Sequence, residues 1–160
     1  MTRRGYSCPF TGTITNAGGN TDLVTILAAD DKPVWIDGFR IGQISEVGDA
    51  AEEGLSFTFH RFTATVTAGT GGSAVTAGLD DQTDTAFGGT CRVNDTAVNT
   101  TSGSALVLDE VAWNIRASPW ETWFPESPKR ISQGEAFIVR CNTTPADDIT
   151  ASWTLFFHEV

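Results

Sequence analysis

Residues 55–66 read Leu-Ser-Phe-Thr-Phe-His-Arg-Phe-Thr-Ala-Thr-Val, and this stretch decides the fold. Apolar and polar side chains alternate along it, and aromatic and β-branched residues dominate its composition. An alternation of period two places one kind of side chain on each side of an extended chain, which is the pattern of a half-buried β-strand. Residues 55–66 are therefore predicted to form a long strand of a sheet, with Phe57 and Phe59 in the core.

The same alternation recurs at intervals along the chain. The predicted strands span residues 6–14, 23–28, 34–44, 55–66, 91–98, 105–115, 136–141 and 149–159. Turn-forming clusters of Gly, Pro, Asn and Asp lie between them, and Gly38 and Gly42 indicate a bend or bulge inside the third strand. About eight strands at this spacing predict an all-β fold, a two-sheet antiparallel sandwich of the jelly-roll type, with a barrel as the alternative.

A single domain over residues 1–160 is expected, because a chain of this length buries about 70% of its unfolded surface around one core. Residues 1–6 are predicted to form a short N-terminal arm. Residues 67–89 are rich in Thr, Gly, Ala, Ser and Asp, so they are predicted to be a long surface excursion. Both segments are predicted to owe their order to neighbouring subunits. The predicted core comprises Phe57, Phe59, Leu106, Leu108, Trp153 and Leu155.

The charge and the cysteine pattern exclude several classes of protein. Ten Lys and Arg against 20 Asp and Glu give a net charge of −10, which repels phosphate backbones and anionic lipid. No nucleic-acid or membrane partner is expected, and no run reaches the ~18 to 20 apolar residues of a membrane span or resembles a Sec signal. Cys8, Cys91 and Cys141 are widely spaced, which predicts reduced thiols and neither a disulfide framework nor a zinc site.

Catalytic machinery is not evident in the sequence. Neither His60 nor His158 has a partner at motif spacing, and Ser73 lacks the second glycine of a nucleophile elbow. His60, within an aromatic strand, is read as a hydrogen-bonded structural residue. Adjacent acids in extended segments point away from each other, so the paired aspartates are read as solvated turn residues. The chain is therefore expected to be no enzyme and to carry no catalytic residue, cofactor or metal.

The segment around Trp120, Trp123 and Phe124 contains three large aromatic residues between prolines. Exposing so much aromatic surface is costly unless something covers it. Either the segment folds back as a lid over one end of the sandwich, or it forms a contact patch for a protein or a sugar. A protein interface is favoured, because only Glu121, Thr122 and Glu126 lie near enough in the sequence to read sugar hydroxyls.

Four features of the chain point to a known family. They are the start Met1-Thr-Arg-Arg4, the stretch 39–53 with Arg40-Ile-Gly-Gln43 before an acidic loop, the Ser-Gln-Gly-Glu turn at 132–135, and the aromatic final strand at 153–157. In these features the chain resembles small bacteriophage virion proteins, specifically the β-sandwich decoration (cement) proteins on the outside of tailed-phage heads.

The resemblance implies a homodimer or homotrimer that binds the major capsid protein and reinforces the head against internal DNA pressure. It also implies a place on the virion surface, synthesis in the host cytoplasm, and no catalytic residues. Arg3 and Arg4 are predicted to reach a carboxylate patch on the capsid, and together with Trp120, Trp123 and Phe124 they are the candidate interface. The alternatives are a lectin-like jelly roll with both tryptophans stacking on sugars, and a tail or neck component.

Overall fold

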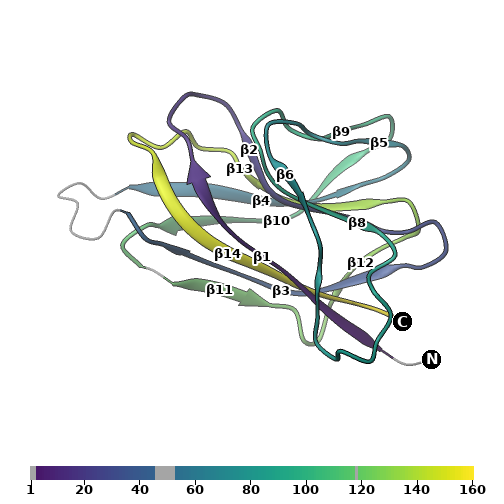
Figure 1. Ribbon diagram of the computed structural model, residues 1–160. Coiled ribbons are helices and arrows are strands. Elements are labelled where there is room, and N and C mark those ends of the chain that lie inside the picture. The colour runs from purple at the N-terminus through teal and green to yellow at the C-terminus, as the bar shows by residue number, and fades with distance from the viewer. Residues whose placement is uncertain (1–2, 46–52, 118) are drawn as a thin grey trace.

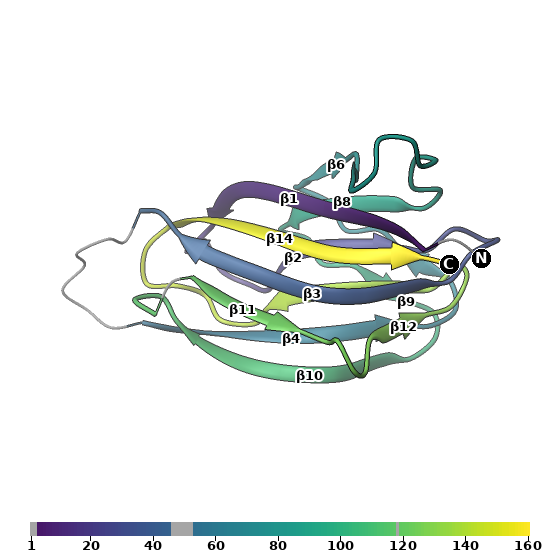
Figure 2. The same ribbon diagram turned by 90° about the horizontal axis from the view of Figure 1, so that it is seen from below.

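The computed structural model describes residues 3–45, 53–117 and 119–160, and no helix that could span a membrane occurs among them. Two six-stranded antiparallel sheets form the two layers of the molecule (Figure 1, Figure 2). Sheet A contains β1 (Arg4–Ile14), β3 (Val34–Gln43), β7 (Gly78–Leu79), β11 (Trp120–Trp123), β12 (Lys129–Ile131) and β14 (Ile149–Glu159). Sheet B contains β2 (Thr21–Leu27), β4 (Gly54–Phe62), β6 (Ser73–Val75), β8 (Thr90–Asp95), β10 (Ala105–Asn114) and β13 (Ala136–Cys141). A two-stranded sheet joins β5 (Val66–Thr67) to β9 (Thr100–Thr101).

In both sheets, early strands of the chain pair with late ones. In sheet A the order is β11-β3-β14-β1, and in sheet B it is β10-β4-β13-β2. The first strand thus pairs with the last, and β2 pairs with β13, which precedes the last strand. This is the arrangement of a double-sheet jelly roll, so the predicted all-β sandwich is confirmed. The segment between β4 and β10 supplies the additional strands β5 to β9.

The core lies between the sheets and contains most of the predicted residues. Phe57, Phe59, Trp153 and Leu155 are all buried, and the Trp153 indole Nε1 donates a hydrogen bond to the Leu23 carbonyl at 2.9 Å. This bond ties β14 of sheet A to β2 of sheet B. Because the indole N–H has a partner inside the core, the large Trp153 ring is buried without an unpaired polar group.

The prediction for Leu106 is wrong, because 40% of this residue is exposed. β10 is an edge strand of sheet B, and its register with β4 shifts between Val107 and Asp109. This bulge changes the phase of the side-chain alternation, which allows Leu108 and Trp113 to contact the core although they are five residues apart. A regular strand would have placed Leu108 and Trp113 on opposite faces.

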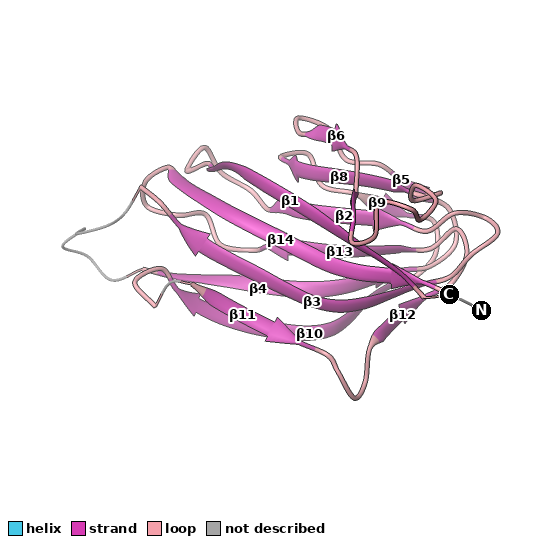
Figure 3. Ribbon diagram, turned by 60° about the horizontal axis from the view of Figure 1, so that its bottom comes forward, coloured by secondary structure: helices cyan, strands magenta, loops and turns pink. Residues whose placement is uncertain are grey.

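The excursion at 67–89 is more closely integrated than expected. β6 pairs with β8 in sheet B and β7 pairs with β1 in sheet A, so the segment bridges the two sheets (Figure 3). Val75, Leu79 and Phe87 pack against the core, and the Phe87 ring centroid lies 4.9 Å from that of Phe157. A few well-placed apolar residues thus anchor the predicted excursion to the core of its own chain.

Residues 4–6 of the predicted N-terminal arm belong to a strand of sheet A. β1 begins at Arg4, and Tyr6 is buried with its hydroxyl donating to the Thr85 carbonyl at 2.9 Å. Burial, with the Glu159 carboxylate beside it, raises the pKa of Tyr6 to about 12. Residues 1–2, and most of the acidic connection at 45–53, lie outside the described residues.

Cys8, Cys91 and Cys141 are all free and buried, as predicted. Burial raises the pKa of Cys141 to about 11, so its reactive thiolate is scarce at neutral pH.

Candidate interaction surface

The three aromatic residues of the predicted interface point to two different sides of sheet A. Trp120 and Trp123 are the first and last residues of β11, so side-chain alternation separates them. Trp120 and Phe124 pack inward, with ring centroids 6.4 Å and 6.2 Å from that of the buried Phe59. Trp123 lies on the outer face and is 47% exposed. The lid interpretation therefore fits Trp120 and Phe124, whereas Trp123 alone is available to a partner.

Trp123 rests flat on the sheet because Gly38 lies opposite it in β3. A Cβ at position 38 would collide with the Trp123 ring and would lie 2.8 Å from the Thr122 carbonyl oxygen. On its other side Trp123 contacts Phe156 of β14, with ring centroids 4.9 Å apart. The predicted bulge near Gly38 is also confirmed, since Phe156 and Phe157 pair with Gly38 and Ile36 and leave Asp37 as the extra residue.

A row of aromatic and charged side chains continues from Trp123 across the outer face of sheet A. His158 stacks on Trp35 with a centroid distance of 5.7 Å and an interplanar angle of 11°. The His158 Nδ1 atom lies 2.9 Å from the Asp37 carboxylate, and this carboxylate is also paired with Arg3 at 3.0 Å. We call this surface the basic aromatic face. It comprises Arg3, Trp35, Asp37, Arg40, Trp123, Arg130, Phe156 and His158.

The cations of the two sheets differ in how they are neutralised. On sheet B, the structure pairs Arg61, Arg92 and Arg140 with carboxylates of the same chain. On sheet A, the Arg40 guanidinium lies 5.6 Å from the centroid of Phe156, and that of Arg130 lies 5.5 Å from Trp35. Neither of these forms an ion pair with a carboxylate in the described ranges. These two cations of sheet A thus lie over aromatic rings, and Glu121 is the residue opposite Arg40 in the neighbouring strand.

Arg3 and Arg4 both lie near the basic aromatic face. The side chain of Arg3 is 64% exposed although it pairs with Asp37, so the pair is a surface ion pair and holds the side chain weakly. Arg4 lines a neighbouring hollow of about 550 Å³ together with Lys32, Trp35 and Glu159. Arg3 of the predicted interface therefore lies beside Trp123, whereas Arg4 lines the neighbouring hollow.

The sequence did not single out Trp35, Asp37, Arg40, Phe156 or His158 as partners of Trp123. These residues come from β3 and β14, and they meet Trp123 only through the pairing of β11 and β14 with β3. A signal for this contact was Gly38, since glycine inside a strand marks a place where another group approaches closely.

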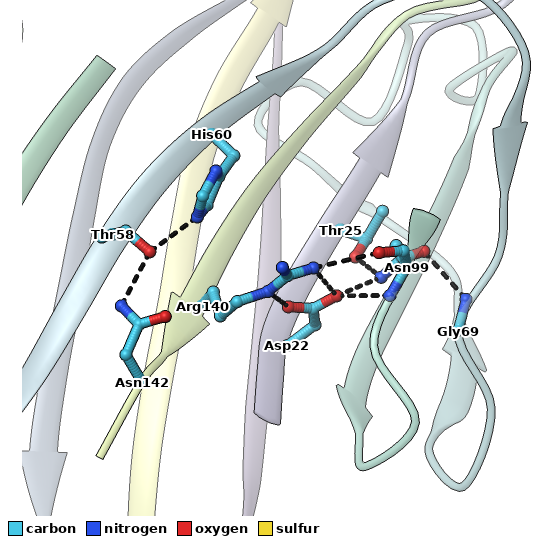
Figure 4. Close-up of polar contacts among 8 residues, drawn as sticks. All are labelled: Asp22, Thr25, Thr58, His60, Gly69, Asn99, Arg140 and Asn142. Atoms are coloured by element: carbon cyan, nitrogen blue, oxygen red, sulfur yellow. Dashed lines mark hydrogen bonds and ion pairs between the residues drawn. The ribbon is translucent and has the colours of Figure 1, made fainter. Parts of the chain in front are cut away.

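His60 belongs to a separate polar cluster on the outer face of sheet B (Figure 4). Its Nε2 atom lies 2.7 Å from the Thr58 hydroxyl, which in turn accepts a hydrogen bond from the Asn142 amide at 2.8 Å. Nearby, Arg140 forms a two-pronged ion pair with Asp22, at 2.5 Å and 3.0 Å. His60 is 8% exposed and its described partners are structural, in agreement with the sequence interpretation.

The buried Asp22 carboxylate also binds residues next to the two-stranded sheet of β5 and β9. It accepts hydrogen bonds of 2.7 Å from both the backbone N–H and the side-chain amide of Asn99. Asn99 extends this network to the backbone N–H of Gly69 at 2.9 Å and to Thr25 at 2.8 Å (Figure 4). The cluster thus secures the excursion to the sandwich and is read as a structural device.

Protonation of His60 is expected to destabilise the fold. Burial lowers the pKa of His60 below its usual value, and the Arg140 guanidinium lowers it further. The pKa of a histidine in the unfolded chain is about 6.5, so the unfolded chain takes up the proton more readily than the folded protein does. The free energy of unfolding is therefore highest above pH 6.5 and decreases as the pH falls below it. Urea unfolding at pH 7.5 and 5.5 should show a larger loss of stability for the wild type than for His60→Gln. Equal losses in both proteins would contradict the assignment.

No group of three or more His, Cys, Asp or Glu side chains that could hold a metal ion occurs in the part of the chain that the structure describes.

Comparisons with known proteins give little further information. No family model and no curated protein matches the chain. Among solved structures, the chain is similar to a chain in the structure of infectious bursal disease virus, Gx strain, with 14% sequence identity and a TM-score of 0.21. The match covers 99% of this chain and 42% of the viral one. A TM-score this low establishes neither a shared fold nor a shared function.

Proposed function

We propose that this chain is a non-enzymatic virion structural protein, which binds the outside of a phage capsid as a decoration protein and stabilises the head. The observation that carries the proposal is the basic aromatic face, which places the exposed Trp123 ring and two arginines stacked on aromatic rings together on one sheet of an acidic chain. The resemblance of residues 39–53 and 132–135 to decoration proteins supports the same function.

The chemistry of this face fits a protein surface that presents carboxylates, and the proposed partner is the major capsid protein. Trp and Arg are the residue types that contribute most to binding at the centres of protein interfaces. Arg40 and Arg130 lie over aromatic rings, where they retain their charge and can pair with an incoming carboxylate. The surrounding net charge of −10 would repel a nucleic acid before it reached them.

Changes on the basic aromatic face are expected to release the protein from heads. Trp123→Ala should weaken binding by about 30-fold or more, since truncating an aromatic residue at an interface centre typically costs about 2 kcal/mol or more. The double variant Arg40→Glu with Arg130→Glu should abolish binding by reversing the charge of the face. Binding is measured by co-sedimentation with heads that lack the protein.

The exposed Arg116, in the connection that follows β10, provides a control with the same type of charge reversal at a residue that belongs to neither β3 nor β14. Arg116→Glu should bind heads as the wild type does. If Trp123→Ala and the double variant also bind like the wild type, the basic aromatic face is not the capsid contact.

A carbohydrate-binding function is the second candidate, and one structural observation favours it. A hollow of about 470 Å³ beside Trp123 is lined by Arg3, Asp37 and His158, which supply the polar groups that the sequence near Trp123 lacks. An exposed indole beside hydrogen-bonding groups suits a sugar ring. If Trp123→Ala stays on heads but loses the retention on a glycan array that the wild type shows, the carbohydrate-binding function replaces the decoration function.

A further inference from the structure

The edge strand β10 of sheet B is longer than the other edge strands of the two large sheets. β6, β7 and β11, which end the strand orders elsewhere, have three, two and four residues, whereas β10 has ten. Among the described strands β10 pairs with β4 alone, and it runs along the rim of the molecule (Figure 2, Figure 3). An edge strand of this length presents backbone N–H and C=O groups that a further strand can pair with.

The first half of β10 lacks the features by which proteins usually protect such an edge. Residues 103–108 read Gly-Ser-Ala-Leu-Val-Leu, with neither a charge nor a proline. Leu106 is 40% and Val107 is 56% exposed, so apolar side chains accompany the open backbone groups. The bulge at Leu108 ends this unprotected part, and the acidic Asp109 and Glu110 follow it. The part of this edge that can pair with another strand is thus limited to residues 103–108.

The charge pattern indicates that a second copy of the chain fits this edge. Two copies of a protein with a net charge of −10 repel each other, and they approach most easily where both surfaces are uncharged. Identical strands related by a two-fold axis pair antiparallel, with one residue opposite its own copy. If that residue is Val107, Asp109 lies opposite Ala105 and Glu110 opposite Ser104, so no carboxylate faces another. A register centred on Asp109 or Glu110 would bring like charges together.

We propose that two copies of this chain form a two-fold symmetric dimer by antiparallel pairing of β10 with β10 of the second copy, centred on Val107. The pairing joins two six-stranded sheets into one continuous sheet. It places Val107 against Val107 and Leu106 against Leu108 of the second copy, and it satisfies the open backbone groups of residues 105–108. The basic aromatic face belongs to the other sheet, so the dimer and the proposed capsid contact are independent and are tested by different variants.

A disulfide trap tests both the pairing and its register. Residues directly opposite in an antiparallel pair have Cα atoms about 4.5 to 5.5 Å apart, a separation that a disulfide can span. Val107→Cys is therefore expected to form a covalent dimer, with twice the 17.1 kDa mass of the chain, under mild oxidation. The native cysteines should not interfere because all three are buried.

Glu110→Cys is the matched control on the same strand. In the proposed register its two copies lie about 20 Å apart, three residues to either side of the centre, so it should not cross-link. Cross-linking of Glu110→Cys to the same extent as Val107→Cys would overturn the register.

Sedimentation of the untreated protein tests the dimer without a cross-link. The wild type should sediment as a dimer, and Val107→Lys as a monomer with an unchanged far-UV circular dichroism spectrum, because Val107 is exposed in the single chain and the change adds a charge at the contact. Its melting temperature should be lower only by the stabilisation that the dimer contributes. A monomeric wild type, or a Val107→Lys protein that stays dimeric, would overturn the proposal. The binding of Trp123→Ala to heads is a separate measurement, so the proposed dimer and the proposed capsid contact can be contradicted independently.

Discussion

Trp153→Ala is expected to lower the free energy of unfolding by about 3 to 5 kcal/mol, out of a typical total of ~5 to 15 kcal/mol. The ring of Trp153 is buried between the sheets and contacts Phe10, with centroids 5.3 Å apart. Truncation leaves a cavity and removes the hydrogen bond from the indole to the Leu23 carbonyl. Urea unfolding followed by circular dichroism measures the loss.

Trp123→Ala is the matched control for this prediction, because it makes the same chemical change on the surface. Trp123 is 47% exposed and should cost about 1 kcal/mol or less, since most surface substitutions have small effects. A similar loss in both variants would contradict the placement of Trp153 in the core and Trp123 outside it.

Asp22→Ala is expected to destabilise the protein by about 3 to 5 kcal/mol, because it leaves a mostly buried cation without its partner. The Asp22 side chain is fully buried, and the Arg140 side chain that it pairs with is 13% exposed. The variant also removes the acceptor for two hydrogen bonds from Asn99. Hydrogen exchange should therefore show faster exchange at the backbone amides of Gly69 and Asn99, as the two-stranded sheet of β5 and β9 is released.

Two further variants distinguish the effect of breaking the Asp22–Arg140 ion pair from the effect of removing any carboxylate. Asp81→Ala removes an exposed carboxylate whose hydrogen bonds in the described structure come from Thr83 of its own turn, and it should destabilise the protein far less than Asp22→Ala does. Asp22→Ala combined with Arg140→Met should recover part of the stability, because no charge is then left buried. If the double variant is less stable than Asp22→Ala alone, the unpaired Arg140 is not the source of the destabilisation.

Much of the sandwich could be predicted from period-two alternation, because its long strands have one face in the core. The ends of the strands were predicted less accurately than their existence. The predicted strand 55–66 stops at Phe62 in the structure, since Ala64 adopts a positive φ of 60°, which turns the chain. The short strands β6, β7 and β12 have two or three residues, too few to show a period, and pairing with distant strands defines them.

The candidate surface was less predictable than the fold. Trp123 could be chosen from the sequence, as could Arg3 and Arg4, because aromatic residues and arginines are unusual in exposed segments of so acidic a chain. The sequence grouped Trp120 and Phe124 with Trp123 because all three are neighbours, and only the strand β11 shows that they point to different sides. The contacts of Trp123 with Phe156 and of His158 with Asp37 depend on strand register, which local sequence does not specify.

The number of copies of this protein in purified phage particles tests the proposed decoration function most directly. A decoration protein repeats over the capsid lattice, and each copy contributes through many equivalent contacts. Quantitative mass spectrometry, with the major capsid protein of the same particles as the internal reference, should find hundreds of copies per particle. A handful of copies would contradict the account and would assign the chain to the tail, neck or a fibre, and absence from the particles would remove it from the virion altogether.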